Sequence, residues 1–131
     1  MSDGTSYHNA PGLVAPAGHY SHVTIARGLA FVAGQLPLDK QGTPLTGAPF
    51  ADQARQALQN LDACLTAVSL TRADLVQVRV YVTNVGDWPE FDALYAQWLG
   101  GHRPARAVAG VNELHFGVAV EVEAVAALPT A

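Results

Sequence analysis

The chain of 131 residues has the size of one ordinary domain; half of its residues are hydrophobic, which excludes a disordered chain. The formal net charge is −4 and the seven Lys and Arg residues are scattered singly, which argues against binding to nucleic acid, where clustered cations are needed. No apolar run approaches the ~20 residues of a membrane-spanning helix. Because the polar N-terminus carries no secretory signal and a single cysteine cannot form an internal disulfide, we expect a cytoplasmic protein.

The N-terminal third of the chain begins with a segment rich in Gly, Pro, Ser and Asn. This composition predicts an ordered arm or a loose tail at residues 1–14, ahead of a domain at residues 15–131. Two apolar runs, residues 23–26 and 29–32, flank Arg27 and Gly28 and predict a β-hairpin that Gly34 ends.

The middle of the chain changes its hydrophobic period twice. Apolar residues recur every three or four positions over residues 50–69, which predicts an amphipathic helix. Residues 76–82 alternate between valines and larger side chains, as in a strand. A second helix follows, with Asp87 as its N-cap, Glu90 at the capping-box spacing and Gly100 at its end.

The last two predicted strands carry the charged residues of interest. Arg106 opens the first of them, and residues 118–125 form the second. In the second strand the valines share one face, while Glu121 and Glu123 share the other. We expect the two strands to be neighbours, so that an arginine and a carboxylate form an anion site beside a general base. The pattern alone does not choose between Glu121 and Glu123.

The order of elements predicts an α+β fold, in which two helices cover one face of a mixed sheet of four or five strands. The uncovered face would carry apolar side chains, among them Phe31 and Ala33. Because a second copy is the simplest cover for such a face, we expect a homo-oligomer with sites at its interfaces.

Other candidate residues have ordinary structural interpretations. His19 and His22 have HxxH spacing, but without a helix or a nearby carboxylate we interpret them as loop residues rather than metal ligands. Cys64 lies among the apolar positions of the first helix and is expected to be a buried, inert thiol. Tyr20, at the entry to the first strand, either packs against neighbouring residues or lines a pocket.

Several segments, in the same order and spacing, resemble the Rid/YjgF family of enamine/imine deaminases, also called the endoribonuclease L-PSP family. They lie between residues 15 and 126 and include PAGHYSH, FVAGQLPLD, DLVQVRVYVTN, RPARAV and VEVEAVA. The resemblance implies a chorismate-mutase-like fold and a trimer with a central barrel. It also implies hydrolysis of 2-imino or enamine acids to 2-oxo acids and ammonia in clefts between subunits, without a metal or organic cofactor.

The resemblance assigns roles to individual residues. The arginine that binds the substrate carboxylate falls on Arg106, and the glutamate proposed to position water falls on Glu121. The positions that would line the substrate pocket are Tyr20, Ala33, Gly34, Asp92 and Val108. This chain departs from the family pattern at several of them, with Ala33 for serine, Asp92 for asparagine and Val108 for cysteine, and it has His19 and His22 in the segment GHYSH.

Two alternatives accompany the deaminase reading. The first is a non-catalytic module of the same trimeric fold that binds small carboxylates, which the departures favour. The second is a ribonuclease, which the net negative charge and the absence of a basic run disfavour. The expected partners are therefore a small imino or 2-oxo acid and two further copies of the chain, with neither nucleic acid nor membrane.

Overall fold

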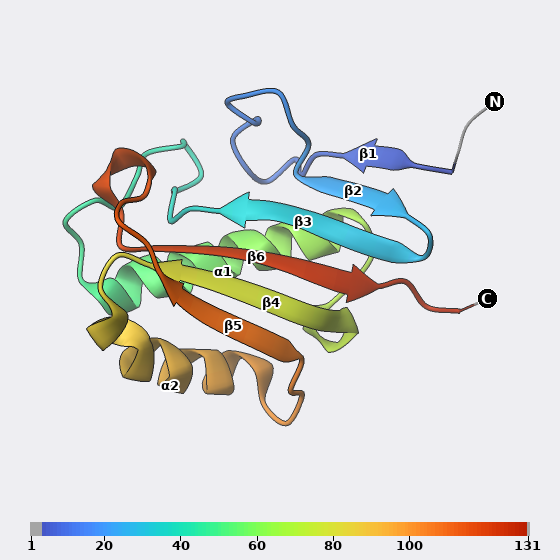
Figure 1. The fold of residues 1–131 in the computed structure, drawn as a ribbon. Coiled ribbons are helices and arrows are strands. Elements are labelled where there is room, and N and C mark those ends of the chain that lie inside the picture. The colour runs from blue at the N-terminus through green and yellow to red at the C-terminus, as the bar shows by residue number, and fades with distance from the viewer. Residues whose placement is uncertain (1–3, 131) are drawn as a thin grey trace.

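The computed structural model describes residues 4–130, so part of the predicted arm, residues 1–3, lies outside the described residues. Six strands form one mixed sheet in the order β1-β2-β3-β6-β4-β5. Both helices lie on the same side of this sheet (Figure 1). The predicted α+β fold with two helices on one face is therefore confirmed, with a sheet of six strands rather than four or five.

The elements follow the predicted order, with one additional strand at the beginning of the chain. In chain order they are β1 (Ser6–His8), β2 (Val23–Ala26), β3 (Leu29–Gln35), α1 (Phe50–Ala67), β4 (Leu75–Val82), α2 (Trp88–Leu99), β5 (Ala105–Gly110) and β6 (Val120–Ala127). Short 3₁₀ turns precede β4, α2 and β6, at η1 (Arg72–Asp74), η2 (Val85–Asp87) and η3 (His115–Gly117).

The N-terminal segment is an integral part of the sheet. Strand β1 pairs with β2 in an antiparallel arrangement, with Tyr7 opposite Thr24. Ala10 follows it and is only 3% exposed. The polar composition of this segment gave no sign of a strand, because an edge strand of three residues buries too little surface to show an alternating pattern.

The predicted hairpin is formed by β2 and β3, with Val23 opposite Val32. The prediction that Gly34 ends it is wrong, because β3 continues to Gln35. The register between β3 and β6 shifts between Val32 and Gln35, as at a β-bulge. A glycine inside a strand is typical of such an irregularity, or of a place where another group approaches the backbone closely.

The prediction that the last two strands are neighbours is also wrong. Strand β4 lies between them, parallel to β5 and antiparallel to β6. The reason is the helix α2, which connects β4 to β5: a helical crossover brings the chain back to the same edge of the sheet, and β5 therefore pairs alongside β4. Strand β6 occupies the centre of the sheet, where its valine face is fully buried.

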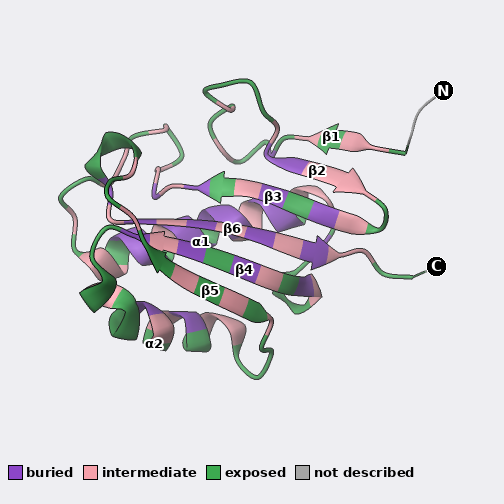
Figure 2. Ribbon diagram, viewed as in Figure 1, coloured by how far each residue is buried: buried purple, intermediate pink, exposed green. Residues whose placement is uncertain are grey.

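The core lies between the helices and the sheet. Helix α1 packs against β6 and β3 and buries a stripe that includes Leu61, Cys64 and Leu65 in a core to which the valines of β4 also belong. In Figure 2 the buried residues form a band along α1 and the central strands, whereas β5 and the loops are mostly exposed. Cys64 is fully buried, and burial raises the pKa of its thiol to about 12, so it is the inert thiol that the sequence predicts.

Helix α2 begins after Asp87, as predicted, but the predicted capping box is absent. The Asp87 side chain makes no capping hydrogen bond among the described residues. The 3₁₀ turn η2 runs directly into the helix, which gives Asp87 helical backbone angles (φ −82°, ψ −7°). A capping side chain needs an extended backbone at that position. No helix in the described part of the chain is long and apolar enough to cross a membrane.

Candidate active site

Arg106 lies on the edge strand β5 and faces the helices. It pairs with Val78 of β4, whose side chain is buried in the core on the helix side of the sheet. The guanidinium carbon of Arg106 lies 5.1 Å from the centre of the Tyr95 ring of α2. Its Nη1 donates a hydrogen bond of 2.7 Å to Oδ1 of Asp92, one turn earlier on the same helix. The arginine is thus held in a fixed orientation by a ring and a carboxylate.

A hollow opens beside this arginine, between the end of α2 and the beginning of β5. We call it the arginine hollow; it is lined by Asp92, Tyr95, Ala96, Leu99, Gly100, His102, Arg103, Pro104 and Arg106. Its volume of about 480 Å³ is ample for a small organic acid. The Arg106 side chain is 23% exposed, so its charge is only partly screened by solvent.

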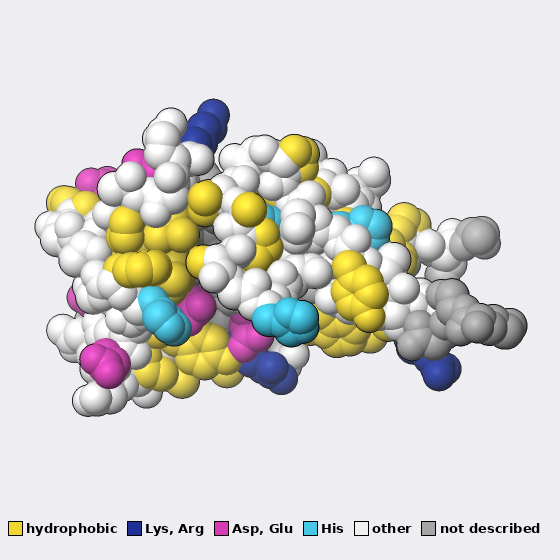
Figure 3. All heavy atoms as spheres, turned by 90° about the horizontal axis from the view of Figure 1, so that it is seen from above, with side chains coloured by type: hydrophobic (Ala, Val, Ile, Leu, Met, Phe, Trp, Pro, Cys, Tyr) yellow, Lys and Arg dark blue, Asp and Glu magenta, His cyan; other side chains and the backbone are white. Residues whose placement is uncertain are grey.

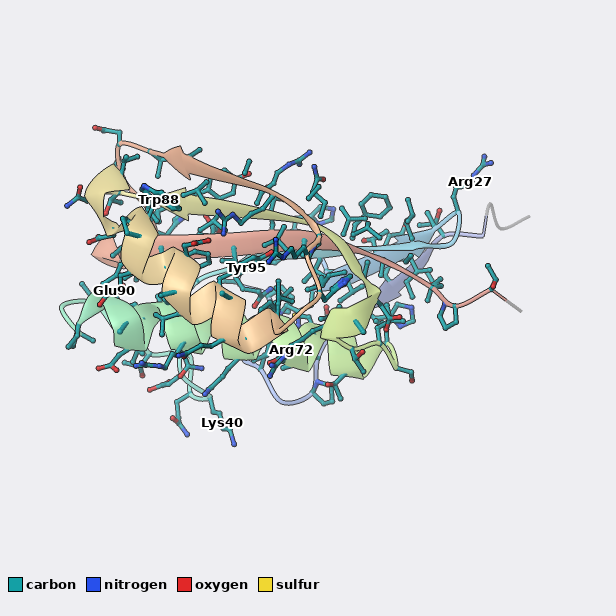
Figure 4. All side chains as sticks on the ribbon, turned by 90° about the horizontal axis from the view of Figure 1, so that it is seen from below. Arg27, Lys40, Arg72, Trp88, Glu90 and Tyr95 are labelled. Atoms are coloured by element: carbon teal, nitrogen blue, oxygen red, sulfur yellow. The ribbon has the colours of Figure 1, made fainter. Side chains whose placement is uncertain are left out.

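Tyr95 forms the floor beneath the guanidinium. It extends from α2 toward the strands (Figure 4) and is 6% exposed. Burial raises the pKa of Tyr95 to about 12, so the ring stays neutral and presents its π face to the cation. Sequence reasoning placed Tyr95 in the helix stripe but missed this contact; its position three residues after Asp92 was the available signal.

Glu121 lies on the other face of the sheet, which the helices leave open. Its neighbours along β6, Val120 and Val122, point into the core, so alternation directs Glu121 to the open face. Burial raises the pKa of its carboxyl above the usual value; the nearby His115 opposes this shift and the charge of Glu123 adds to it. A carboxyl with a raised pKa is suited to acid–base chemistry near neutral pH.

The structure separates the two glutamates that the pattern left equivalent. Glu123 accepts a hydrogen bond from the hydroxyl of Tyr81, which lies on the neighbouring strand β4 and pairs in register with Glu121. Glu121 makes no side-chain hydrogen bond within residues 4–130, and its carboxylate lies against the backbone of Gly34. A Cβ at position 34 would overlap that carboxylate, so any other residue here would require the Glu121 side chain to move.

Gly34 and Tyr20 line one small hollow between the N-terminal segment, the loop that follows β3, and α1. Tyr20 is largely exposed, and Ala33 precedes Gly34 on β3 with its backbone N–H donating to His22 O at 2.9 Å. The structure thus brings Gly34 next to Glu121, and the same glycine lines the hollow of Tyr20. Val108 lies with Arg106 and Asp92 instead, since it follows Arg106 by two residues on the same face of β5.

Two half-sites therefore lie on opposite faces of one sheet: Arg106 with Asp92 and Val108, and Glu121 with Gly34. Along β4, the strand between them, Arg106 pairs with Val78 and Glu121 pairs with Tyr81, three residues farther on. Within one copy of the chain, the sheet itself separates the arginine from the glutamate. They can act on one molecule only if they come from different copies.

The two histidines with HxxH spacing have different surroundings. His19 is exposed in the loop, as interpreted from the sequence. His22 is buried: its Nδ1 accepts a hydrogen bond of 2.9 Å from the backbone N–H of Ala10, and its own backbone N–H donates to Asn9 Oδ1. Through these two hydrogen bonds His22 holds the N-terminal segment beside the beginning of β2. Burial lowers its pKa, so the ring is neutral at physiological pH.

The class of protein is defined by the fold: one α+β domain with a mixed sheet, two helices on one face and an open second face. Residues 9–128 match the model of the endoribonuclease L-PSP family. The RutC family protein PH0854 of Pyrococcus horikoshii is 35% identical over 118 residues, which cover 90% of this chain and 91% of that protein.

Solved structures agree with this match. The Rid family protein YyfA of Yersinia pestis has a TM-score of 0.90 at 27% identity, covering 95% of this chain and 99% of that chain. TdcF of E. coli, solved with bound serine, has a TM-score of 0.87 at 26% identity, with the same coverage of the two chains. The protein belongs to the endoribonuclease L-PSP family, the Rid/YjgF family that its sequence motifs resemble, and that prediction is confirmed.

Proposed function

We propose that this protein hydrolyses 2-imino or enamine acids to 2-oxo acids and ammonia. The observation that carries the proposal is the Arg106 guanidinium, fixed over Tyr95 at the wall of a hollow of suitable size, in a member of this family. A planar, permanently charged fork is suited to a carboxylate. The TdcF structure contains serine, a small molecule with a carboxylate beside a nitrogen, which supports a substrate of the same kind here.

The proposed chemistry needs little beyond orientation and one proton-transferring group. Arg106 binds the carboxylate and fixes the C=N carbon beside a water molecule. The bimolecular attack of water thus becomes an effectively unimolecular step within one oriented complex. Glu121 takes a proton as the water oxygen bonds to that carbon. For the protonated imine this gives a carbinolamine, and the same proton then passes to its nitrogen. The C–N bond breaks, ammonia leaves with the bonding electrons, and the hydroxyl gives its own proton to Glu121 as the C=O bond forms. None of these steps draws on a metal or an organic cofactor.

We propose further that the working site is a cleft between copies in a homotrimer. Arg106 and Glu121 lie on opposite faces of the sheet, so a second copy must supply one of them. The open face also carries Phe31, which is 45% exposed and flanks a shallow hollow with Arg79 and Glu123. A sheet face that is free of helices and exposes a large aromatic side chain is suited to cover by another subunit.

A coupled assay tests the activity. A serine/threonine dehydratase generates the imine, semicarbazide competes for it, and the readout is how far this protein suppresses semicarbazone formation. We expect suppression by the wild type and a loss of about 100-fold or more in Arg106→Ala, because the carboxylate is no longer fixed. Arg55→Ala is the matched control, since Arg55 lies on the exposed face of α1, outside the arginine hollow.

The glutamates provide a second matched pair in the same assay. Glu121→Gln should lose activity, whereas Glu123→Gln should retain it, because Glu123 already accepts a hydrogen bond from Tyr81. Wild-type turnover in Arg106→Ala would contradict the carboxylate clamp. If the wild type suppresses no semicarbazone with any of several amino-acid substrates, the deaminase proposal fails and the non-catalytic binding module becomes the better reading.

A further inference from the structure

The arginine hollow contains its own carboxylate. Asp92 Oδ1 lies 2.7 Å from Arg106 Nη1, and the Asp92 side chain is 48% exposed, so the negative charge sits at the mouth of the site. The hydrogen bond uses Nη1 only. Within residues 4–130 nothing accepts a hydrogen bond from Arg106 Nη2 or Nε, which leaves two parallel donors for an incoming carboxylate.

We infer that Asp92 makes the arginine hollow select small acids that also carry a cationic nitrogen over acids that are plain anions. This inference rests on the proposed carboxylate clamp and names its substrate class. The protonated form of a 2-imino acid has a positive nitrogen beside its carboxylate and is zwitterionic. The 2-oxo acid product is a plain anion. Asp92 thus favours the substrate over the product.

The charges of the hollow give the physical reason. Arg106 and Asp92 together have a net charge of zero, so a bound plain anion leaves one uncompensated negative charge, whereas a zwitterion leaves none. Two unit charges about 6 Å apart, at the effective dielectric of a half-exposed site, interact strongly enough to change an affinity roughly three- to tenfold. Arg103 also lines the hollow, but it is exposed and its charge is more strongly screened.

A purely anchoring role for Asp92 predicts a different result. If the carboxylate only held Arg106 in place, replacing it would weaken every carboxylate ligand to the same extent. An asparagine at this position keeps an oxygen that accepts the Arg106 hydrogen bond while removing the charge. Asp92→Asn therefore separates the effect of the charge from that of anchoring. If Asp92 only anchors Arg106, this variant leaves the ratio of the affinities for an anionic and a zwitterionic acid unchanged.

Calorimetric titration with two probes of the same carbon skeleton tests the inference: 2-oxobutanoate is the anion and 2-aminobutanoate is the zwitterion. We expect Asp92→Asn to bind 2-oxobutanoate roughly three- to tenfold more tightly than the wild type does, and to bind 2-aminobutanoate within about twofold of the wild type. Asp92→Ser, a second neutral variant, should shift the ratio of the two affinities in the same direction.

Glu90→Gln is the matched control. Glu90 lies two residues earlier on α2, is exposed and does not line the hollow, so this variant changes the net charge equally without changing the site. It should alter neither affinity. Equal shifts for both probes in Asp92→Asn, or no shift for either, would overturn the inference.

The result also separates this inference from the proposed function. Imine hydrolysis by the wild type, with an unchanged affinity ratio in Asp92→Asn, would remove only the role of the Asp92 charge. If neither probe binds to the wild type at millimolar concentration, the clamp itself is absent and both proposals fail.

Discussion

At the scale of single residues, Gly34 leaves the space that the Glu121 carboxylate occupies. The backbone of β3 passes so near the carboxylate that a Cβ at position 34 would overlap it. Because Glu121 is a flexible side chain, it can move aside at little cost in stability. A misplaced catalytic group, however, costs far more in rate than in folding.

We therefore expect Gly34→Ala to lower imine hydrolysis about 10- to 100-fold while leaving the melting temperature nearly unchanged. The coupled semicarbazide assay and a thermal melt measure the two effects. Gly12→Ala is the control, since no atom lies within 4 Å of a Cβ at that position. The double variant Gly34→Ala/Glu121→Gln should be no slower than Glu121→Gln alone; fully additive losses would show that Gly34 does not act through Glu121.

At the scale of elements, His22 couples strand β1 to the rest of the sheet. Its Nδ1 is the acceptor for the N–H of Ala10, a residue that is only 3% exposed. Burial holds the pKa of His22 below its usual value of 6.5. The stabilisation is therefore complete above pH 6.5 and is lost as the pH falls through the folded-state pKa, because a proton on Nδ1 would face the Ala10 N–H.

Hydrogen exchange should detect this dependence directly. We expect the Ala10 amide to lose protection as the pH falls below 6.5, after correction for the intrinsic exchange rate, while amides of β4 remain protected. His22→Ala should lower the free energy of unfolding by about 1–3 kcal/mol at pH 8, since it leaves a buried N–H without its acceptor. His19→Ala, in the exposed loop, should have no measurable effect; an equal loss from both variants would contradict the assignment.

At the scale of the whole molecule, the two half-sites predict complementation between inactive variants. Arg106→Ala and Glu121→Gln should each be inactive alone. If the arginine and the glutamate of one site come from different copies, mixed assemblies contain some sites with both residues intact. Random mixing in equal amounts in a trimer should restore about a quarter of the wild-type rate.

Subunit exchange can be promoted by mild denaturation and refolding of the mixture, followed by the coupled assay. Refolding each variant alone is the control and should restore nothing. An inactive mixture with proven exchange would mean that the arginine and the glutamate of one site come from the same copy. Measurement of the molecular mass in solution tests the trimer independently.

The surface charge bears on the ribonuclease alternative, which the family description keeps open. The net charge is −4, and on the surface seen from above the Lys and Arg side chains lie apart from one another (Figure 3). A nucleic-acid site gathers such cations along one groove. The hollow that contains Arg106 and Arg103 also contains Asp92, which further weakens its attraction for phosphate.

The sequence by itself determined both helices, the strands other than β1, the fold class and the family. Periodicity locates both helices and the hairpin, because amphipathic faces are local patterns that the chain must satisfy wherever it folds. Alternation in β6 likewise separates the buried valines from Glu121 and Glu123. The order of the motifs also indicates Arg106 and Glu121 as site candidates, because a match to the motifs of a family depends on residue identity and not on position in space.

Only the tertiary structure decided which of these residues meet. The crossover through α2 inserts β4 between β5 and β6, and no local pattern encodes that strand order. It separates an expected neighbouring pair by one strand. The register of β5 against β4 turns Arg106 toward the helices, on the face opposite Glu121, where Asp92 and Tyr95 of α2 surround it. Strand pairing, close backbone approach at Gly34 and the burial of His22 all depend on residues distant in the sequence, which meet only when the chain has folded.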